Sequence, residues 1–178
     1  VYSSLVMRDS ENNIVGDLAD HWETSEDGLV WTFYLRQDVK WHNGKQFTSA
    51  DVKASYDRLL NAENPVRYTS TMSIITGCNV VDDYTIELTT ADPCPMMLAT
   101  LCHRANLILD ADYIEKYGTE LGLTAESCNG TGPYVLKQWD MGEQMVFEAF
   151  HDYFKGEAPT KNLIIQVMPE ASSRAVAL

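Results

Sequence analysis

The chain has 178 residues with 26 acidic and 13 basic side chains, which give a formal net charge of -13. This acidity argues against nucleic acid as a partner and disfavours adsorption to anionic lipid, because both attract basic protein surfaces. Hydrophobic residues make up 45% of the sequence, which is enough for a packed core, and no apolar run approaches the ~20 residues of a membrane-spanning helix.

Residues 29–36 alternate between apolar and polar side chains, which is typical of a half-buried strand. Turn signals flank this segment at Asp27-Gly28 and at Asn43-Gly44. The alternation continues through Val39 and Trp41, so the sequence predicts a hairpin-like unit. The aromatic and aliphatic side chains expected to face the core are Trp31, Phe33, Leu35 and Trp41.

Residues 48–60 carry the clearest helix pattern in the chain. Thr48 fits the N-cap position, and Asp51 completes a capping box in which each side chain accepts a backbone N–H. Phe47 and Val52 bracket the cap as a hydrophobic staple. We expect the helix to end before Pro65, which cannot continue it. The apolar stripe consists of Val52, Tyr56, Leu59 and Leu60.

Strand patterns return in residues 74–81 and 84–89, which flank Asp82-Asp83 and predict an antiparallel hairpin. Asp92-Pro93 then reads as an N-cap with proline at the first helical position. The core side of that helix is expected to carry Met97, Leu98 and Leu101.

A second short helix is expected over residues 110–117, where Gly118 ends it. Residues 129–133 are rich in Gly, Thr and Pro and mark the clearest break in the chain, so we place a boundary near residue 130. The strands expected after this break are residues 134–139, 144–150 and 163–168.

Both ends of the chain read as cut. Val1 is not an initiator residue, and residues 172–178 read as the first turns of a helix whose apolar face is unfinished. We therefore expect the sequence to be a fragment, and it leaves open whether a signal segment precedes it.

The sequence contains none of the catalytic motifs GxSxG, GxGxxG or HExxH, and no phosphate loop. The four histidines are scattered, and the four cysteines show no metal-ligand spacing. Those cysteines are compatible with buried free thiols or with disulfides. We therefore predict a protein that is not an enzyme and that uses no metal or cofactor. The cysteines are Cys78, Cys94, Cys102 and Cys128.

Several hydrogen-bonding groups cluster beside apolar sequence in residues 102–106. The stretch is either a polar connection between a helix and a strand, or a set of donors at the edge of a cleft. In a cleft, Arg104 would offer a fork to a ligand carboxylate. Tyr68 lies in a predicted loop and is either an ordinary surface tyrosine or part of the same cleft. The candidate ligand-binding residues are Tyr68, His103, Arg104 and Asn106.

A set of short motifs follows one order along essentially the whole chain. They are GDLADHWE (16–23), SEDGLVWTFYLR (25–36), DVKWHNG (38–44), FTSADV (47–52), TGPY (131–134) with Leu136 and Trp139, YF (153–154) and GEAP (156–159), followed by Pro169 and Ser173-Arg174. In this order they resemble the extracytoplasmic solute-binding proteins for oligopeptides, dipeptides and nickel, which are family 5 of the binding proteins that serve ABC importers.

The resemblance implies a fold of the mixed α+β (α/β) class, like the type II periplasmic binding proteins, with a mixed sheet, antiparallel hairpins and flanking helices. Family members have two lobes and three domains. Residues 1–130 resemble the small additional domain of the family, and residues 131–178 resemble the first strands of the ligand-binding lobe, here incomplete. The family places a tyrosine near Tyr68, and its nickel-binding members place an arginine near Arg104.

The resemblance also implies a function. We expect a monomer that captures peptides or similar small solutes outside the cytoplasmic membrane, in the periplasm or as a cell-surface lipoprotein, and delivers them to ABC permease subunits. A ligand-sensing adaptor on the same scaffold, which signals to a membrane receptor, stays as the alternative. The solute itself is not specified, because one fold serves many ligands.

Overall fold

The computed structural model describes residues 1–70 and 72–176, which contain nine strands and four α-helices. The strands are β1 (Val6–Arg8), β2 (Ile14–Gly16), β3 (Ala19–Thr24), β4 (Val30–Leu35), β5 (Ile75–Asp82), β6 (Thr85–Thr90), β7 (Tyr134–Asp140), β8 (Gln144–Ala149) and β9 (Asn162–Gln166). The helices are α1 (Ser49–Leu60), α2 (Met97–Leu101), α3 (Ala111–Tyr117) and α4 (Ala171–Val176), with single 3-10 turns at Arg104–Asn106 and Gly118–Glu120.

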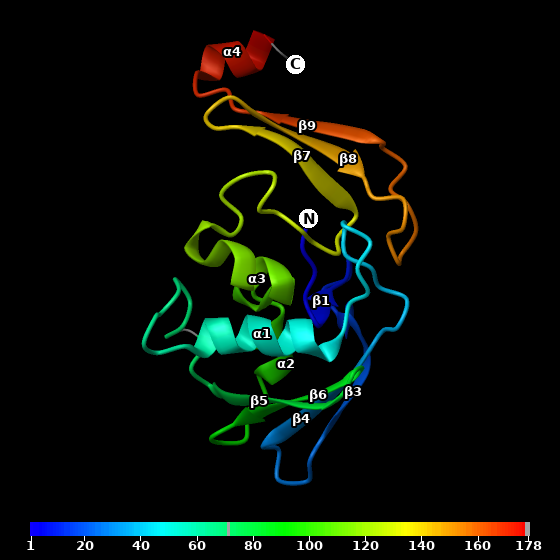
Figure 1. Ribbon diagram of the computed structural model, residues 1–178, viewed down its shortest axis with the longest axis vertical. Coiled ribbons are helices and arrows are strands. Elements are labelled where there is room, and N and C mark those ends of the chain that lie inside the picture. Colours follow the sequence, from blue (N-terminus) through cyan, green and yellow to red (C-terminus); the bar gives the residue numbers. More distant parts are fainter. Residues whose placement is uncertain (71, 177–178) are drawn as a thin grey trace.

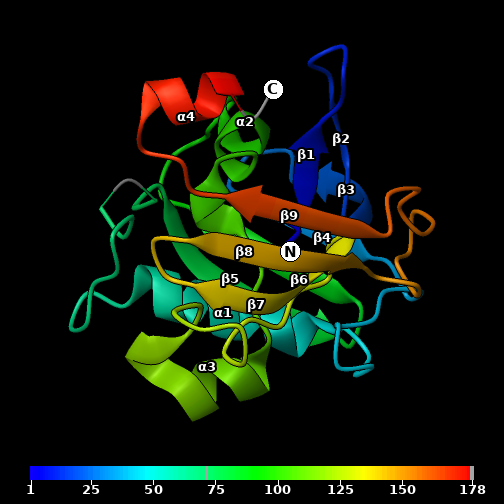
Figure 2. The same cartoon turned by 90° about the horizontal axis from the view of Figure 1, so that it is seen from above.

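Figure 1 shows the chain in two stacked parts. One part holds a four-stranded sheet in the order β3-β4-β6-β5, with α1 packed on β5 and β6 and α3 packed on the far side of α1. The other part is a separate sheet in the order β7-β8-β9, which lies across the rest of the chain when seen from above (Figure 2). All pairings between these strands are antiparallel in the described residues. The expected α+β fold with antiparallel hairpins and flanking helices is confirmed. The expected mixed sheet is wrong, because every strand pair among the described residues is antiparallel.

The main core lies between the four-stranded sheet and α1. In β4, Trp31, Phe33 and Leu35 are buried on one face and the residues between them are half exposed, so the predicted alternation is confirmed. The predicted hairpin of β5 and β6 is also present, with Val80 opposite Ile86.

Helix α1 begins where the sequence predicts. Thr48 is the N-cap, and its backbone N–H donates to the Asp51 carboxylate at 3.1 Å. The expected staple residues Phe47 and Val52 are both fully buried. These contacts fix the start of the helix against the core, and the helix ends at Leu60, before Pro65, as expected.

The first three strands were not predicted from the sequence. Strands β1 and β2 have only three residues each, which is too short for a periodic pattern. Strand β3 exposes Asp20 and His21 in succession, because its pairing with β4 shifts register between Ala19 and His21. The shift removes the alternation that a sequence-based prediction needs.

Two predicted elements differ in detail. Helix α2 begins at Met97 and not at Pro93, because Pro95 disfavours a helical conformation for the residue before it. Val39 and Trp41 are buried as expected, but their hairpin is reduced to a single bridge between neighbouring loop residues. The helix expected over 172–178 is present as α4, and its last two residues lie outside the described part of the chain.

The segment that joins the two parts is buried. The backbone N–H of Gly132 donates to the carbonyl oxygen of Val1 at 2.7 Å, so the start of the chain packs on this junction. His42 holds the same segment: its Nδ1 accepts the N–H of Gly130 at 3.3 Å, and its Nε2 donates to the carbonyl of Gly132 at 2.9 Å. Burial lowers the pKa of His42 to about 4, so the ring is neutral at neutral pH.

Candidate functional site

A hollow of about 370 Å³ opens where α1, the loop after it and the turn at Arg104–Asn106 meet. We call it the arginine hollow, because three of the six arginines of the chain line it. Its lining residues are Tyr2, Ser55, Arg58, Leu59, Val66, Arg67, Tyr68, Arg104, Ala105, Leu107, Leu109, Leu121 and Gly122.

The charges around this hollow are of one sign. No aspartate or glutamate is among its lining residues, although the chain as a whole carries a net charge of -13. Within the described residues, none of the ion pairs involves Arg58, Arg67 or Arg104. A guanidinium presents a planar fork of donors that matches a carboxylate or phosphate. The hollow is therefore suited to an anionic group.

Tyr68 organises the mouth of the arginine hollow. Its half-buried ring meets the ring of His103 edge-on, with 5.2 Å between the centroids. The guanidinium carbons of Arg67 and Arg104 lie 5.4 Å and 5.6 Å from the centroid of the same ring. Each contact is a cation–π interaction, which restrains the long arginine side chains near the hollow.

The floor of the arginine hollow is tied to α1. The backbone N–H of Leu109 donates to the Ser55 hydroxyl oxygen at 2.8 Å, and the Ser55 hydroxyl donates to the carbonyl of Asp51 at 2.8 Å. Ser55 and Leu59 lie one helical turn apart on the face that also carries Arg58. The helix therefore supplies both apolar surface and one cation.

The structure brings three of the four predicted site residues together. Tyr68 and Arg104 line the arginine hollow, and His103 packs against Tyr68 while its Nδ1 accepts the backbone N–H of Ala105 at 3.1 Å. The side chain of Asn106 is buried behind the hollow and hydrogen-bonded within the fold. Ligand contact by these residues stays a prediction.

Sequence reasoning missed Arg58, Arg67 and Tyr2, which also line the arginine hollow. Arg58 sits in a regular amphipathic helix and Arg67 in a loop, and neither position carries a local signal of binding. The one usable signal is the position of Arg67 next to Tyr68, a predicted site residue.

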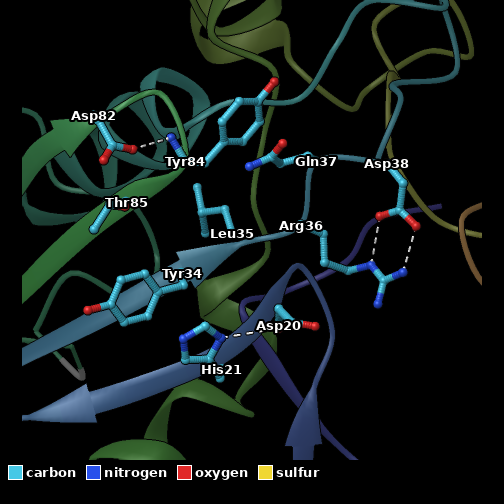
Figure 3. A pocket seen from close by; sticks show the side chains of 10 residues that line it. All are labelled: Asp20, His21, Tyr34, Leu35, Arg36, Gln37, Asp38, Asp82, Tyr84 and Thr85. Atoms are coloured by element: carbon cyan, nitrogen blue, oxygen red, sulfur yellow. Dashed lines mark hydrogen bonds and ion pairs between the residues drawn. The ribbon is translucent and has the colours of Figure 1, made fainter.

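A second, wider hollow of about 590 Å³ lies at the ends of β3, β4 and β6 (Figure 3). His21 stacks on Tyr34 there, with 4.4 Å between ring centroids. The guanidinium of Arg36 is already held by both carboxylate oxygens of Asp38, at 2.9 Å and 2.6 Å. Because this cation is paired and the other charged side chains in the lining, Asp20 and Asp82, are acidic, the hollow offers an anionic solute no free cation.

The described residues were also compared with the requirements of a reactive thiol, a metal site and a membrane-spanning helix. The four cysteines are half-buried free thiols, and burial raises the pKa of Cys78 to about 12, which keeps that thiol protonated. Within residues 1–70 and 72–176, no group of three or more His, Cys, Asp or Glu side chains is placed to hold a metal ion. None of the helices in that part of the chain has the length and apolar content that a membrane crossing requires.

Comparison with known proteins gives one consistent result. Residues 13–178 match the model of a family described as bacterial extracellular solute-binding proteins, family 5 Middle. The chain is 32% identical to the glutathione-binding protein GsiB of Salmonella paratyphi A over 158 residues, which are 89% of this chain and 30% of that protein. It is also 32% identical to the dipeptide-binding protein of Escherichia coli, and that match covers 98% of this chain and 36% of the relative.

Solved structures agree with these matches. AgaA of A. tumefaciens in complex with agropinic acid superposes with a TM-score of 0.91 at 28% identity, over 100% of this chain and 36% of that one. The periplasmic binding protein DppA of Helicobacter pylori, in complex with the peptide STSA, gives 0.89 at 28% identity over 100% of this chain and 39% of DppA. The chain thus spans about a third of the length of the proteins that it matches.

Proposed function

The chain belongs to the bacterial extracellular solute-binding proteins of family 5, and from this membership we propose that the whole protein is the substrate-binding component of an ABC importer. In this proposal it captures peptides or similar small solutes outside the cytoplasmic membrane and delivers them to the permease subunits. Members of the family are solute-binding transport proteins and not enzymes, and we extend this to the present protein. We place it in the periplasm or at the cell surface as a lipoprotein, and we propose that it works as a monomer.

The two parts of the fold correspond to two domains in this proposal. We propose that residues 1–130 are the small additional domain of the family and that residues 131–178 begin the ligand-binding lobe. The separate sheets before and after residue 130 support this division. The remaining two thirds of the length of the relatives would then supply the opposite lobe, and closure between lobes would desolvate the solute.

The arginine hollow is the observation that favours a solute with an anionic group. Arg58, Arg67 and Arg104 line it without a carboxylate partner in the described residues, in a chain that is otherwise strongly acidic. A carboxylate that accepts a charged hydrogen bond from one of these side chains gains about 1.5–3 kcal/mol. The chain as a whole carries a net charge of -13, so a hollow lined by three arginines favours such a solute over the acidic parts of the surface.

The experiment is mass spectrometry of the small molecules released from the purified whole protein. We expect a peptide or another small molecule that carries at least one carboxylate. Recovery of only neutral or cationic solutes would contradict the role of the hollow, and the absence of any bound solute after expression in peptide-rich medium would contradict the proposed function.

A variant then tests the site directly. Arg104→Gln is expected to weaken binding of the recovered solute about tenfold or more, because it removes a charged donor. Arg8→Gln is the matched control, since Arg8 is exposed on β1 and does not line the hollow. Calorimetry that finds equal affinities for the two variants would rule out contact between Arg104 and the solute.

A further inference from the structure

Asn106 has a buried side chain that joins four segments of the chain. Only 2% of the residue is exposed. Its Oδ1 accepts the hydroxyl of Tyr56 on α1 at 3.2 Å. Its Nδ2 donates to the carbonyl of Thr100 near the end of α2 at 2.9 Å and lies 3.4 Å from the sulfur of Met72. One amide therefore ties α1, α2 and the segment around Met72 to its own 3-10 turn.

Three of these four segments carry the arginines of the hollow. Arg58 lies on α1, two residues after Tyr56. Arg67 and Tyr68 belong to the segment of Met72, whose backbone N–H donates to the Tyr68 carbonyl at 3.1 Å. Arg104 is in the turn that ends at Asn106 itself. The amide thus stands behind the arginine hollow at the point where its walls meet.

We propose that Asn106 is a positioning residue, which sets the distances between the three arginines and thereby the spacing of anionic groups that the hollow accepts. The inference rests on the proposed function, in which this hollow receives the solute. The solute need not touch Asn106, because the amide acts through the backbone segments that it joins.

No other side chain of similar size can make the same set of contacts. Aspartate keeps the acceptor but loses the two amide hydrogens that reach Thr100 and Met72. Leucine keeps the volume, leaves the Tyr56 hydroxyl without its partner and removes one of the two hydrogen bonds to the Thr100 carbonyl, which also accepts the N–H of His103. Glutamine adds a methylene group to a filled site.

The test is a spectroscopic one that needs no solute. A fluorotyrosine placed at position 68 of the whole protein reports, through its fluorine NMR resonance, on the guanidinium groups and the His103 ring around it. We expect Asn106→Leu to move this resonance. We also expect the Ala105 amide, which is bonded to His103, to exchange its hydrogen about tenfold faster or more.

The matched control is Ile86→Val, a fully buried position in β6 that makes none of these hydrogen bonds. It should lower the unfolding temperature without moving the fluorine resonance. If Asn106→Leu does not fold, Tyr56→Phe carries the test, because it keeps the ring and removes one bond. It is expected to move the resonance by a smaller amount.

An unmoved resonance in every folded variant of Asn106 or Tyr56 would overturn the proposal. An equal movement in Ile86→Val would overturn it too, since the effect would then follow general destabilisation. Failure to recover a solute from the whole protein would refute the proposed function. The fluorine experiment uses no solute, so its result would not change, and the two proposals can be refuted independently.

Discussion

Asp51 is the acceptor for four donors, three from the segment before α1 and one from the start of α3, and we expect its replacement to be costly. Its side chain is 1% exposed. Its Oδ2 accepts the indole N–H of Trp41 and the backbone N–H of Thr48, both at 3.1 Å. Its Oδ1 accepts the backbone N–H of Ala111 at 3.1 Å and the ammonium group of Lys45 at 3.3 Å.

The substitution Asp51→Asn keeps the shape and replaces one oxygen by an NH₂ group. Whichever way the amide lies, two of the four donors then face another donor. A buried donor without an acceptor costs about 1–3 kcal/mol. The amide can turn its NH₂ group toward Ala111 and Lys45, and Lys45 keeps Asp110 and Asp112 as acceptors. One buried donor is then left unpaired, and we expect a loss of about 1–3 kcal/mol. Native domains are typically stable by only about 5–15 kcal/mol, so this loss is a substantial part of the total stability.

The assay is equilibrium unfolding in urea at pH 7. The matched control is Asp57→Asn on the same helix, where an exposed carboxylate pairs with Lys53 one turn earlier. Such a pair contributes about 0.3–0.5 kcal/mol, so the control should stay close to the wild-type protein. An Asp51→Asn variant within about 1 kcal/mol of wild type would show that the four hydrogen bonds are not the determinant that the geometry indicates.

Two further predictions concern the junction between the two parts. Burial lowers the pKa of His42 from 6.5 to about 4, so below pH 6.5 the unfolded chain binds a proton that the folded chain does not. The free energy of unfolding should therefore fall by about 3 kcal/mol between pH 6.5 and pH 4 through this residue. Urea unfolding across that pH range measures the fall. The variant His42→Gln, which has no such titrating group, should show a smaller fall. Gly132→Ala places a methyl carbon 2.7 Å from the carbonyl oxygen of Val1 and should cost about 1–3 kcal/mol in the same assay, whereas a variant of wild-type stability would show that Val1 moves aside freely.

Local patterns account for the elements that could be predicted from the sequence. Strand β4 was found because three buried side chains alternate within six residues, and α1 because its cap, staple and apolar stripe all lie within residues 47–60. The strands that escaped prediction are defined by partners far along the chain. Strand β3 is held by its pairing with β4 and has an interrupted alternation of its own.

The candidate site is even less predictable from local sequence patterns than these strands. Arg58, Arg67 and Arg104 come from a helix, a loop and a 3-10 turn, and only tertiary packing brings them to one hollow. The resemblance to a family pointed to Tyr68 and Arg104 one at a time. Neither the local patterns nor the resemblance could reveal that three arginines line one hollow without a carboxylate among the other lining residues.

The stretch 102–106 explains why a polar cluster in a sequence is an ambiguous sign of binding. In a 3-10 turn, residues three apart lie on the same side. His103 and Asn106 are three apart, and both serve the fold, one as the cap of the turn and the other as the buried amide behind the hollow. Arg104 lies between them and remains exposed. The two alternatives for this stretch, a polar connection and a set of cleft donors, are therefore compatible, because the connection fixes the backbone from which the donor is presented.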